Sequence, residues 1–292
     1  MQMRSSNKKI IINFTPTGMI PTKKMTPTVP ISINEIIEDM HRACEIGITM
    51  VHLHARDEIT GAPTFRAEVY AKIIEGIRKF APELVICVSL SGRNYNEFEK
   101  RAEPLFLEGP VKPDMGSLTL SSLNFNQVAS LNEPAMIKKL TQTMLEKKIK
   151  PELEVFDVGM INYAKYLAKK KLLIPPFYFN LILGNTACAQ ADLLHVGVII
   201  RDLPDNSFWS IGGVGNAQLF MNMLAIAAGG GVRIGLEDNI WFDAQRTRLA
   251  TNADYLQRIH RIISAAECEL MPASEMRKML NLLPGRGQYG QP

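Results

Sequence analysis

Short apolar runs rich in β-branched and aromatic residues alternate along the chain with longer stretches whose apolar positions recur at helical spacing. The runs lie at residues 10–15, 50–56, 84–90, 115–120, 151–156, 177–183, 208–214 and 231–237. The helical stretches lie at residues 33–46, 66–80, 94–107, 134–148, 159–171, 190–200, 216–228 and 243–266. Strict alternation of this kind indicates parallel strands joined by crossover helices, and it predicts an α/β fold.

Eight strand–helix units in a chain of this length predict a (β/α)8 barrel of the TIM type. A doubly wound open sheet stays open as the alternative, because short strands are easily miscounted in one sequence. The sequence shows no Ser/Gly linker and no repeat other than the strand–helix period, so we expect a single domain over residues 1–292. We expect the Gly- and Pro-rich tail from about residue 283 to be frayed or held by a neighbouring subunit.

Composition narrows the classes of function. The 292 residues carry a net charge of +4, and 46% of them are hydrophobic. These values exclude a disordered chain and a small disulfide scaffold. So weak a charge argues against a nucleic-acid partner and is compatible with anionic small substrates.

The cysteines and the apolar runs indicate a cellular compartment. No C-x-x-C pair occurs among the four cysteines, which favours free thiols in a reducing cytoplasm. The run Ile10–Ile12 is too short for a signal sequence. No stretch approaches the ~18 to 20 uninterrupted apolar residues of a membrane span. We therefore expect a cytoplasmic protein with no membrane partner.

Two histidines lie on one face of the second predicted strand, near its carboxyl end. Residues two apart on a strand share a face, so His52 and His54 can bind one metal ion. A single buried histidine is usually a hydrogen-bonded core residue, but two on one strand end favour a metal site. Active sites of these barrels form at the carboxyl ends of the strands.

The eighth predicted strand places Arg233 and Glu237 on one face, followed by Asp238 at the turn. Barrel interiors are normally filled by branched apolar residues, so these charges need a reason. An internal Arg233–Glu237 ion pair that braces the barrel is one. The other is a carboxylate that completes a two-His, one-carboxylate metal site, beside a cation for an anionic substrate. Barrel closure brings the first and eighth strands together, with the second one place further round.

Other polar side chains are expected inside the barrel. They are Ser89 and Ser91 on the third strand, Ser117 and Thr119 on the fourth, and Glu152 and Glu154 on the fifth. Polar groups that converge from several strand ends form a pocket. Glu154 is either a carboxylate for proton transfer, a group that orients Arg233, or part of a solvated edge.

The seventh predicted strand ends in a glycine-rich turn that opens onto a helix. Such a turn presents backbone N–H groups and a helix N-terminus to an anion. Gly213, Gly215 and Asn216 lie in this turn. Because loops after the seventh and eighth barrel strands often bind phosphate, we expect a phosphate-bearing cosubstrate here.

Three motifs in order along the chain resemble the β-keto acid cleavage enzyme family. They are T-G-x-x-P-T-K at 17–23, V-H-L-H-x-R-D at 51–57 and G-G-x-V-R-x-G-x-E-D-N at 229–239. The resemblance implies a (β/α)8 barrel, a homo-oligomer (dimer or tetramer), and a divalent metal, typically zinc. It also implies a transferase that converts a β-keto acid and acetyl-CoA into acetoacetate and a new acyl-CoA.

Matched position by position, the resemblance implies roles for individual residues. It makes His52, His54 and Glu237 the metal ligands, and Arg233 with Asp238 the dyad in which Asp238 takes the α-proton. Ser89, Ser117 and Glu154 match positions that line the substrate and help to position it or relay protons, and residues 212–215 fall where CoA is expected to pass. We therefore expect Ser89 and Glu154 to be catalytic, Ser117 and Thr119 to bind the substrate, and Gly213, Gly215 and Asn216 to bind CoA, although Asn216 stands where a basic residue is expected. The enzyme for the amino-keto acid has a glutamate at the place of Ile20, where it receives the ammonium. An apolar residue there indicates a substrate that is not cationic.

Two other functions are compatible with H-x-H in a barrel. A metal-dependent hydrolase of the amidohydrolase type usually needs further histidines on the fifth and sixth strands, and the runs PELEVF and FYFNLIL contain none. A non-catalytic metal- or ligand-binding barrel would be free to lose Asp238 and Arg233, which this chain has.

Overall fold

The computed structural model describes residues 8–292. Residues 1–7 lie outside the described residues. They belong to the N-terminal stretch in which the sequence predicts no signal sequence. Eight parallel strands close into a barrel, so the TIM prediction is confirmed and the open sheet is wrong. Around the barrel they are β2 (Ile12–Phe14), β3 (Met50–Leu53), β6 (Val85–Val88), β7 (Met115–Thr119), β10 (Lys150–Val155), β11 (Phe177–Leu183), β12 (Ser207–Gly213) and β13 (Gly231–Ile234).

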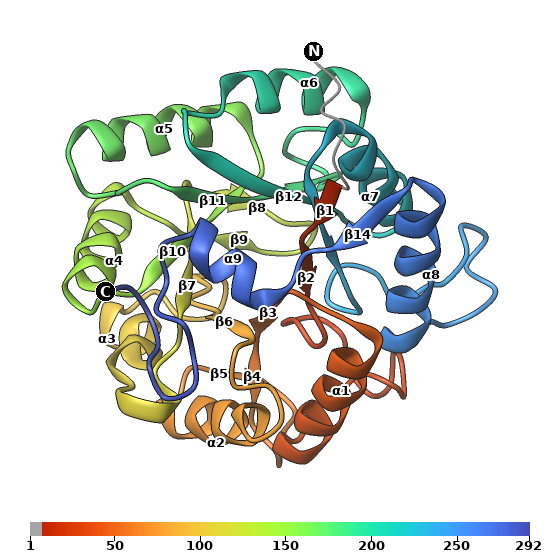
Figure 1. Ribbon diagram of the computed structural model, residues 1–292, viewed down its shortest axis with the longest axis horizontal. Coiled ribbons are helices and arrows are strands. Elements are labelled where there is room, and N and C mark those ends of the chain that lie inside the picture. The colour runs from red at the N-terminus through yellow and green to blue at the C-terminus, as the bar shows by residue number, and fades with distance from the viewer. Residues whose placement is uncertain (1–7) are drawn as a thin grey trace.

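Helices surround the barrel as an outer ring (Figure 1). They are α1 (Ile33–Ile46), α2 (Ala67–Arg78), α3 (Phe98–Ala102), α4 (Pro134–Glu146), α5 (Val158–Lys169), α6 (Leu193–Asp202), α7 (Ala217–Ala228) and α8 (Asn252–Ala265). Each packs an apolar face on the strands, as the helical spacing predicts. Ser32 caps α1 in a capping box with Glu35.

Two predicted helices are shorter than expected. The stretch 94–107 forms only α3 and a 3-10 turn (Glu103–Phe106), because Pro104 has no N–H to continue the helix. The stretch 243–266 becomes helical at Asn252, where Thr251 and Asp254 form a capping box. The residues before Thr251 form a loop at the carboxyl end of the barrel.

Small paired strands complete the structure. Beyond the barrel, β1 (Lys8–Ile10) pairs with β14 (Cys268–Leu270), β4 (Ala55–Arg56) with β5 (Pro63–Thr64), and β8 (Leu123–Asn124) with β9 (Ala129–Ser130). A second 3-10 turn covers Gly109–Val111. The hairpins β4–β5 and β8–β9 follow β3 and β7, so they stand at the carboxyl end, where the candidate residues gather.

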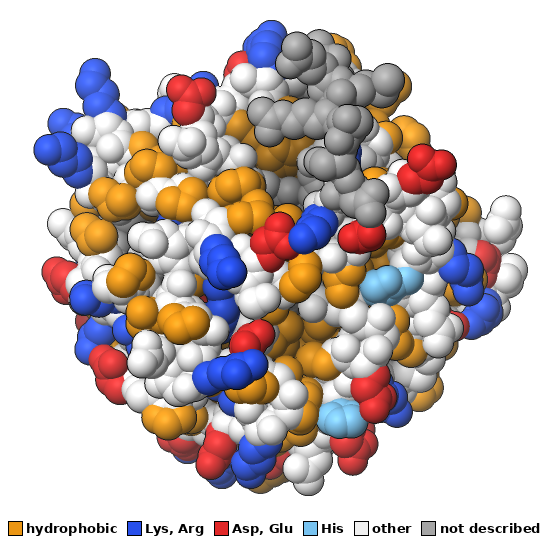
Figure 2. Space-filling view, in the orientation of Figure 1, with side chains coloured by type: hydrophobic (Ala, Val, Ile, Leu, Met, Phe, Trp, Pro, Cys, Tyr) orange, Lys and Arg blue, Asp and Glu red, His pale blue; other side chains and the backbone are white. Residues whose placement is uncertain are grey.

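The C-terminal segment covers the amino end of the barrel. Helix α9 (Ala273–Met279) lies across this end, and the tail returns over it (Figure 1). Tyr289 is buried against the Arg78 guanidinium, and the N–H of Gly290 donates to Asp114. The expectation of a frayed tail is therefore wrong, since the chain's own barrel anchors it, and contact with a neighbouring subunit stays a prediction. Charged side chains of both signs are interspersed on this face (Figure 2).

The helices and the cysteines bear on where the protein is located. Within residues 8–292, no helix is both long and apolar enough to cross a membrane. The four cysteines are free thiols, and Cys87 is buried inside the barrel. The cytoplasmic location stays a prediction.

Candidate active site

The carboxyl ends of neighbouring strands bring the predicted metal ligands together. Strand β2 lies between β13 and β3, which is the closure that the sequence predicts. The Nε2 atoms of His52 and His54 are 3.2 Å apart, and His54 Nε2 is 3.2 Å from Glu237 Oε1. Both histidines are buried, at 1% and 6% exposure. The three residues form one cluster with the ligand types that a divalent metal takes.

Two features of the chain fit a metal ion at this cluster. Glu237 Oε2 is buried and has no hydrogen-bond partner within residues 8–292. His52 Nδ1 lies 2.5 Å from Glu152 Oε2, so a ring proton is held there and Nε2 is the nitrogen that faces His54 and a metal ion. A buried carboxylate oxygen without a donor is available to a cation, and the other oxygen of the same carboxylate lies 3.2 Å from His54 Nε2.

Glu152 holds the ring of His52, a role that the sequence did not predict. Its Oε1 accepts hydrogen bonds from Asn13 at 2.7 Å and Asn180 at 3.1 Å, so three strands hold it. Burial alone would lower the pKa of His52, but the carboxylates of Glu152 and Glu237 raise it to about 9. The sequence signal for this role is that Glu152 lies two residues before Glu154 and so shares its strand face. The partners across the barrel, which are His52, Asn13 and Asn180, show no spacing pattern that would reveal it.

A second possible donor set uses His52, Cys87 and Glu152. Burial raises the pKa of the Cys87 thiol well above its ordinary value, which disfavours the thiolate that a metal needs. Glu152 already accepts from His52, Asn13 and Asn180. The set with Glu237 therefore fits a metal better.

Arg233 holds both acidic residues that follow β13. Its Nε and Nη2 donate to Asp238 at 2.7 and 3.1 Å, and Nη2 also donates to Glu237 at 2.8 Å. Burial raises the pKa of Asp238 more than Arg233 lowers it, and Glu237 raises it further. The arrangement combines the two readings that the sequence left open, because the ion pair with Glu237 exists inside the candidate site. It also fixes Asp238 as an oriented carboxylate.

The glycine-rich turn after β12 serves these residues directly. A Cβ at Gly212 would lie 2.9 Å from Arg233 Cδ, so the glycine leaves room for the arginine. Gly215 has a φ of +59°, and its N–H donates to the carbonyl of Asp238 at 2.8 Å. Asn216 Nδ2 donates to Ala244. With these donors used inside the chain, contact of Gly213, Gly215 and Asn216 with CoA stays a prediction.

Glu154, at the end of β10, lies near the histidine pair. Its Oε1 is 4.0 Å from His52 Nε2, and Thr119 Oγ1 donates to its Oε2 at 2.6 Å. Within residues 8–292 it forms no hydrogen bond to Arg233, although the two charges act on each other. Burial, helped by Glu152, raises the pKa of Glu154, against the lowering effect of His52. Proton transfer and orientation of Arg233 both stay predictions for Glu154.

The predicted serines and the loop after β2 surround the cluster. Ser89 and His54 line the same narrow cavity, together with Met19. Ser117 Oγ is already used, because it accepts from the N–H of Leu90 at 3.1 Å. Ile20 follows Met19 in the loop and is 52% exposed. The substrate roles of these residues stay predictions.

Arg56 fixes the loop that carries Ile20. Its three donor groups bind the carbonyls of Gly18, Pro21 and Gly61 at 2.8 to 2.9 Å. Five N–H donors on a rigid plane suit an arginine to tie several carbonyls at once. The loop after β2 is therefore held to the hairpin after β3.

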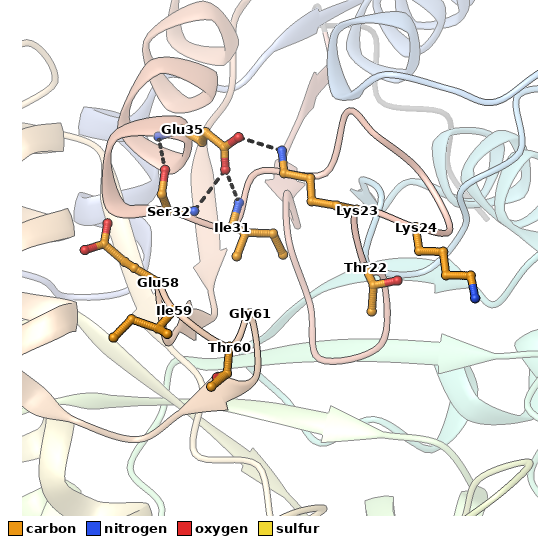
Figure 3. Close-up of a pocket in the computed structure, with 10 residues that line it drawn as sticks. All are labelled: Thr22, Lys23, Lys24, Ile31, Ser32, Glu35, Glu58, Ile59, Thr60 and Gly61. Carbon is orange, nitrogen blue, oxygen red and sulfur yellow. Dashed lines mark hydrogen bonds and ion pairs between the residues drawn. The ribbon is translucent and has the colours of Figure 1, made fainter.

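A larger cavity of about 470 Å³ lies beside this loop and contains none of the predicted site residues (Figure 3). Lys23 points to Glu35 across its rim at 2.6 Å, and Lys24 points away (Figure 3). Glu35 also accepts from the N–H groups of Ile31 and Ser32. The charges at this cavity thus stabilise the start of α1.

Comparisons with known proteins give the same assignment for nearly the whole chain. The family model described as beta-keto acid cleavage enzyme matches residues 9–282. A 3-keto-5-aminohexanoate cleavage enzyme from Fusobacterium nucleatum is 33% identical over 94% of this chain and 98% of its own. A 3-oxoadipate:acetyl-CoA acetyltransferase from Cupriavidus necator is 32% identical over 93% of this chain and 94% of its own.

Solved structures agree in fold. The apo structure of ObcA superposes with a TM-score of 0.78 at 19% identity, over 87% of this chain and 65% of that one. This chain thus spans about two thirds of ObcA. A truncated 3-deoxy-D-arabino-heptulosonate 7-phosphate synthase from Thermotoga maritima matches with a TM-score of 0.53 at 13% identity, over 91% of each chain. The fold is shared at these identities, and the family follows from the sequence: this chain belongs to the β-keto acid cleavage enzymes, as its motifs predict.

Proposed function

We propose that the protein converts a β-keto acid and acetyl-CoA into acetoacetate and a new acyl-CoA. The observation that carries the proposal is the cluster of His52, His54 and Glu237, with Asp238 held beside it by Arg233. We propose that the cluster binds Zn²⁺ or another divalent ion. When bound there, the ion supplies a Lewis acid that draws charge from the oxygens of the keto acid.

The chain's own residues position and move the protons. Asp238 takes a proton from the carbon between the keto and carboxylate groups, and the two donors of Arg233 hold its oxygens in place. Glu152 holds the proton on His52 Nδ1, which keeps Nε2 available as a ligand. Glu154, which lies 4.0 Å from His52, and Ser89, which lines a cavity with His54, relay the second proton transfer.

The bonds balance without another reactant. The deprotonated carbon forms a bond to the acetyl carbon as the thioester bond breaks. The released CoA thiolate then adds to the keto carbon of the original acid. The bond between that carbon and its neighbour breaks, and the proton returns to the carbon, which gives acetoacetate and the new acyl-CoA.

Membership of the family does not determine which acyl chain the β-keto acid carries. Relatives are named for substrates of different charge: 3-keto-5-aminohexanoate, 3-oxoadipate and 3-dehydrocarnitine. Ile20 supports a substrate that is not cationic, because it offers no carboxylate in the loop beside the site. Ser117 and Thr119 are proposed to line the substrate, and Gly213, Gly215 and Asn216 to face CoA.

The first test is a coupled assay of the purified, metal-analysed protein with acetyl-CoA and a panel of β-keto acids. Acetoacetate and the new acyl-CoA are measured by mass spectrometry. The expected result is equal amounts of both products from acids without a cationic group. If metal is bound and no acid yields acetoacetate, the proposal is wrong, and hydrolysis or a non-catalytic barrel takes its place.

We also propose that the chain forms a homo-oligomer. Leu193 and Leu194 at the start of α6 are 66% and 73% exposed. Adjacent leucines so exposed are candidates for a subunit interface. Light scattering coupled to size exclusion is expected to give a dimer or tetramer, and a monomer at micromolar concentration would contradict this.

A further inference from the structure

Arg93 is a charged residue in a loop at the carboxyl end of the barrel. It lies in the loop between β6 and α3, and its guanidinium carbon is 3.6 Å from the centre of the Phe125 ring. Phe125 lies between β8 and β9, so loops after two neighbouring barrel strands hold the pair. The ring covers one face of the guanidinium, and the N–H donors remain in the plane of its edge.

The guanidinium of Arg93 has no acceptor within residues 8–292. Its Nε is buried and unpartnered, and none of its nitrogens is within ion-pair distance of a carboxylate. Ser89, which begins the same loop, lines a cavity together with His54, so the loop borders the site. A buried donor of a charged group is costly unless it is paired, so an anion between Arg93 and the metal cluster would complete this part of the site.

We propose that Arg93 binds a second carboxylate at the far end of the acyl chain, so that the preferred substrates are β-keto dicarboxylic acids. The inference rests on the function proposed above. The reacting end of the substrate must lie beside Asp238 and the metal cluster, and Arg93 stands beyond the end of β6, outside that centre. A planar guanidinium with one face stacked presents two parallel donors, which match a carboxylate.

The phosphates of CoA are the other anions that the reaction brings. The long pantetheine arm separates them from the thioester, while Arg93 lies four residues from Ser89, which lines a cavity with His54 at the reacting centre. This distance favours a group carried by the keto acid itself. Ile20 adds no charge that would compete for it.

The test compares 3-oxohexanedioate with 3-oxohexanoate, which differ only in the terminal carboxylate. The measured quantity is the ratio of kcat/KM for the dicarboxylate to that for the monocarboxylate. Arg93→Met is expected to lower this ratio roughly 100-fold. Arg93→Lys should retain part of it, because an ammonium keeps the charge and loses the fork. Arg201→Met, which removes an exposed arginine on α6, is the matched control and should leave the ratio unchanged.

Calorimetry separates this inference from the proposed function. Hexanedioate is expected to bind the metal-loaded wild type more tightly than hexanoate, and Arg93→Met should abolish the difference. If no β-keto acid turns over but this difference is present, the reaction is wrong and the role of Arg93 stands. An equal loss on both keto acids, an increased KM for acetyl-CoA, or no preference of the wild type for the dicarboxylate would each overturn the inference. Unchanged melting and metal content show that the variants are folded.

Discussion

The two ends of the barrel each bury a cluster of charges, and the clusters differ in how completely their atoms are paired. The amino-end cluster consists of Asp114, Arg277 and Arg78. The carboxyl-end cluster consists of His52, His54, Glu152, Glu154, Arg233, Glu237 and Asp238. Burial is similar in the two, so burial alone does not separate a brace from a site.

At the amino end, the central pair is satisfied. Asp114 accepts two hydrogen bonds from Arg277 at 2.9 and 2.8 Å, and one each from the N–H groups of Ile86 and Gly290 at 3.1 Å. The other donors of Arg277 bind the carbonyls of three residues, which are Glu83, Leu84 and Leu283. The cluster therefore ties α9 and the tail to the barrel and leaves Asp114 no room for a ligand.

At the carboxyl end, buried atoms lack partners. They include Glu237 Oε2, Arg233 Nη1, Asn13 Oδ1, Asn180 Oδ1 and Arg93 Nε. Buried polar groups in native proteins are nearly always paired, so a concentration of orphaned atoms marks a place that a ligand completes. The amino-end cluster has one such atom, Arg78 Nε, so the number of unpaired atoms, more than charge, distinguishes the candidate active site from the brace.

The largest expected effect separates chemistry from metal binding at the carboxyl end. Asp238→Asn removes the proposed base and keeps the size of the side chain. Turnover should fall by about 1,000-fold, because a positioned general base contributes roughly 100- to 10,000-fold to the rate. Metal content by emission spectroscopy should stay at the wild-type value, since Asp238 is not among the ligands.

Asp205→Asn is the matched control for that variant, because Asp205 is exposed in the loop after α6. It should turn over at the wild-type rate. Loss of metal from Asp238→Asn would make Asp238 a ligand and contradict its role as the base.

The next effect breaks the brace. Asp114→Asn leaves the Arg277 guanidinium, which is 1% exposed, without its counter-charge. The free energy of unfolding in urea should fall by about 3 to 5 kcal/mol. The turnover of the folded fraction should be unchanged, since the cluster lies at the opposite end of the barrel. Asp202→Asn in the surface pair with Arg201 is the control, and its free energy of unfolding should stay near that of the wild type.

Glu152 sharpens the comparison, because it is fully paired like Asp114 but contacts a ligand of the proposed metal. Glu152→Gln keeps an acceptor for Asn13 and Asn180 and loses the negative charge beside His52. The affinity for Zn²⁺, measured by competition with a chelator, should fall by about 10- to 100-fold. Glu154→Gln is the comparison variant, which should slow turnover and change the affinity by less than about threefold. Equal affinities for wild type and Glu152→Gln would make Glu152 a brace only.

The sequence predicts the fold well, because each strand and helix of a (β/α)8 barrel produces a hydrophobic pattern over neighbouring residues. The apolar runs and the helical spacing repeat in register with the strands, and capping residues such as Ser32 mark where a helix begins. Two of the errors have different causes, one local and one distant in the chain. The loop before Asn252 has helix-compatible residues, and a capping box at Thr251 sets the start of α8 later. The tail carries Gly and Pro, and its order comes from Asp114, far away in the chain.

The candidate site is predictable only in part. His52 and His54 share a strand face, and Glu237 follows from the family motif, so the metal cluster can be named from the sequence. Glu152 and Arg93 could not be assigned in the same way. The role of Glu152 depends on contacts across the barrel, and that of Arg93 on an aromatic ring from another loop. Neither contact leaves a spacing pattern in one sequence.

The smallest expected effect concerns a charge that belongs to neither cluster. Asp39 on α1 accepts from Asn252 at 2.7 Å, and burial raises its pKa to about 6, against the lowering effects of Asn252, Arg42 and Lys23. In the unfolded chain its pKa is near 3.8, so the native state gains stability as the pH falls from about 6 to about 4. Asp39→Asn should therefore stabilise the protein by about 2 kcal/mol at pH 7 and by much less near pH 4. Urea unfolding at the two pH values measures this, and a loss of activity in the variant would show that an incompletely compensated charge outside the two clusters also serves function.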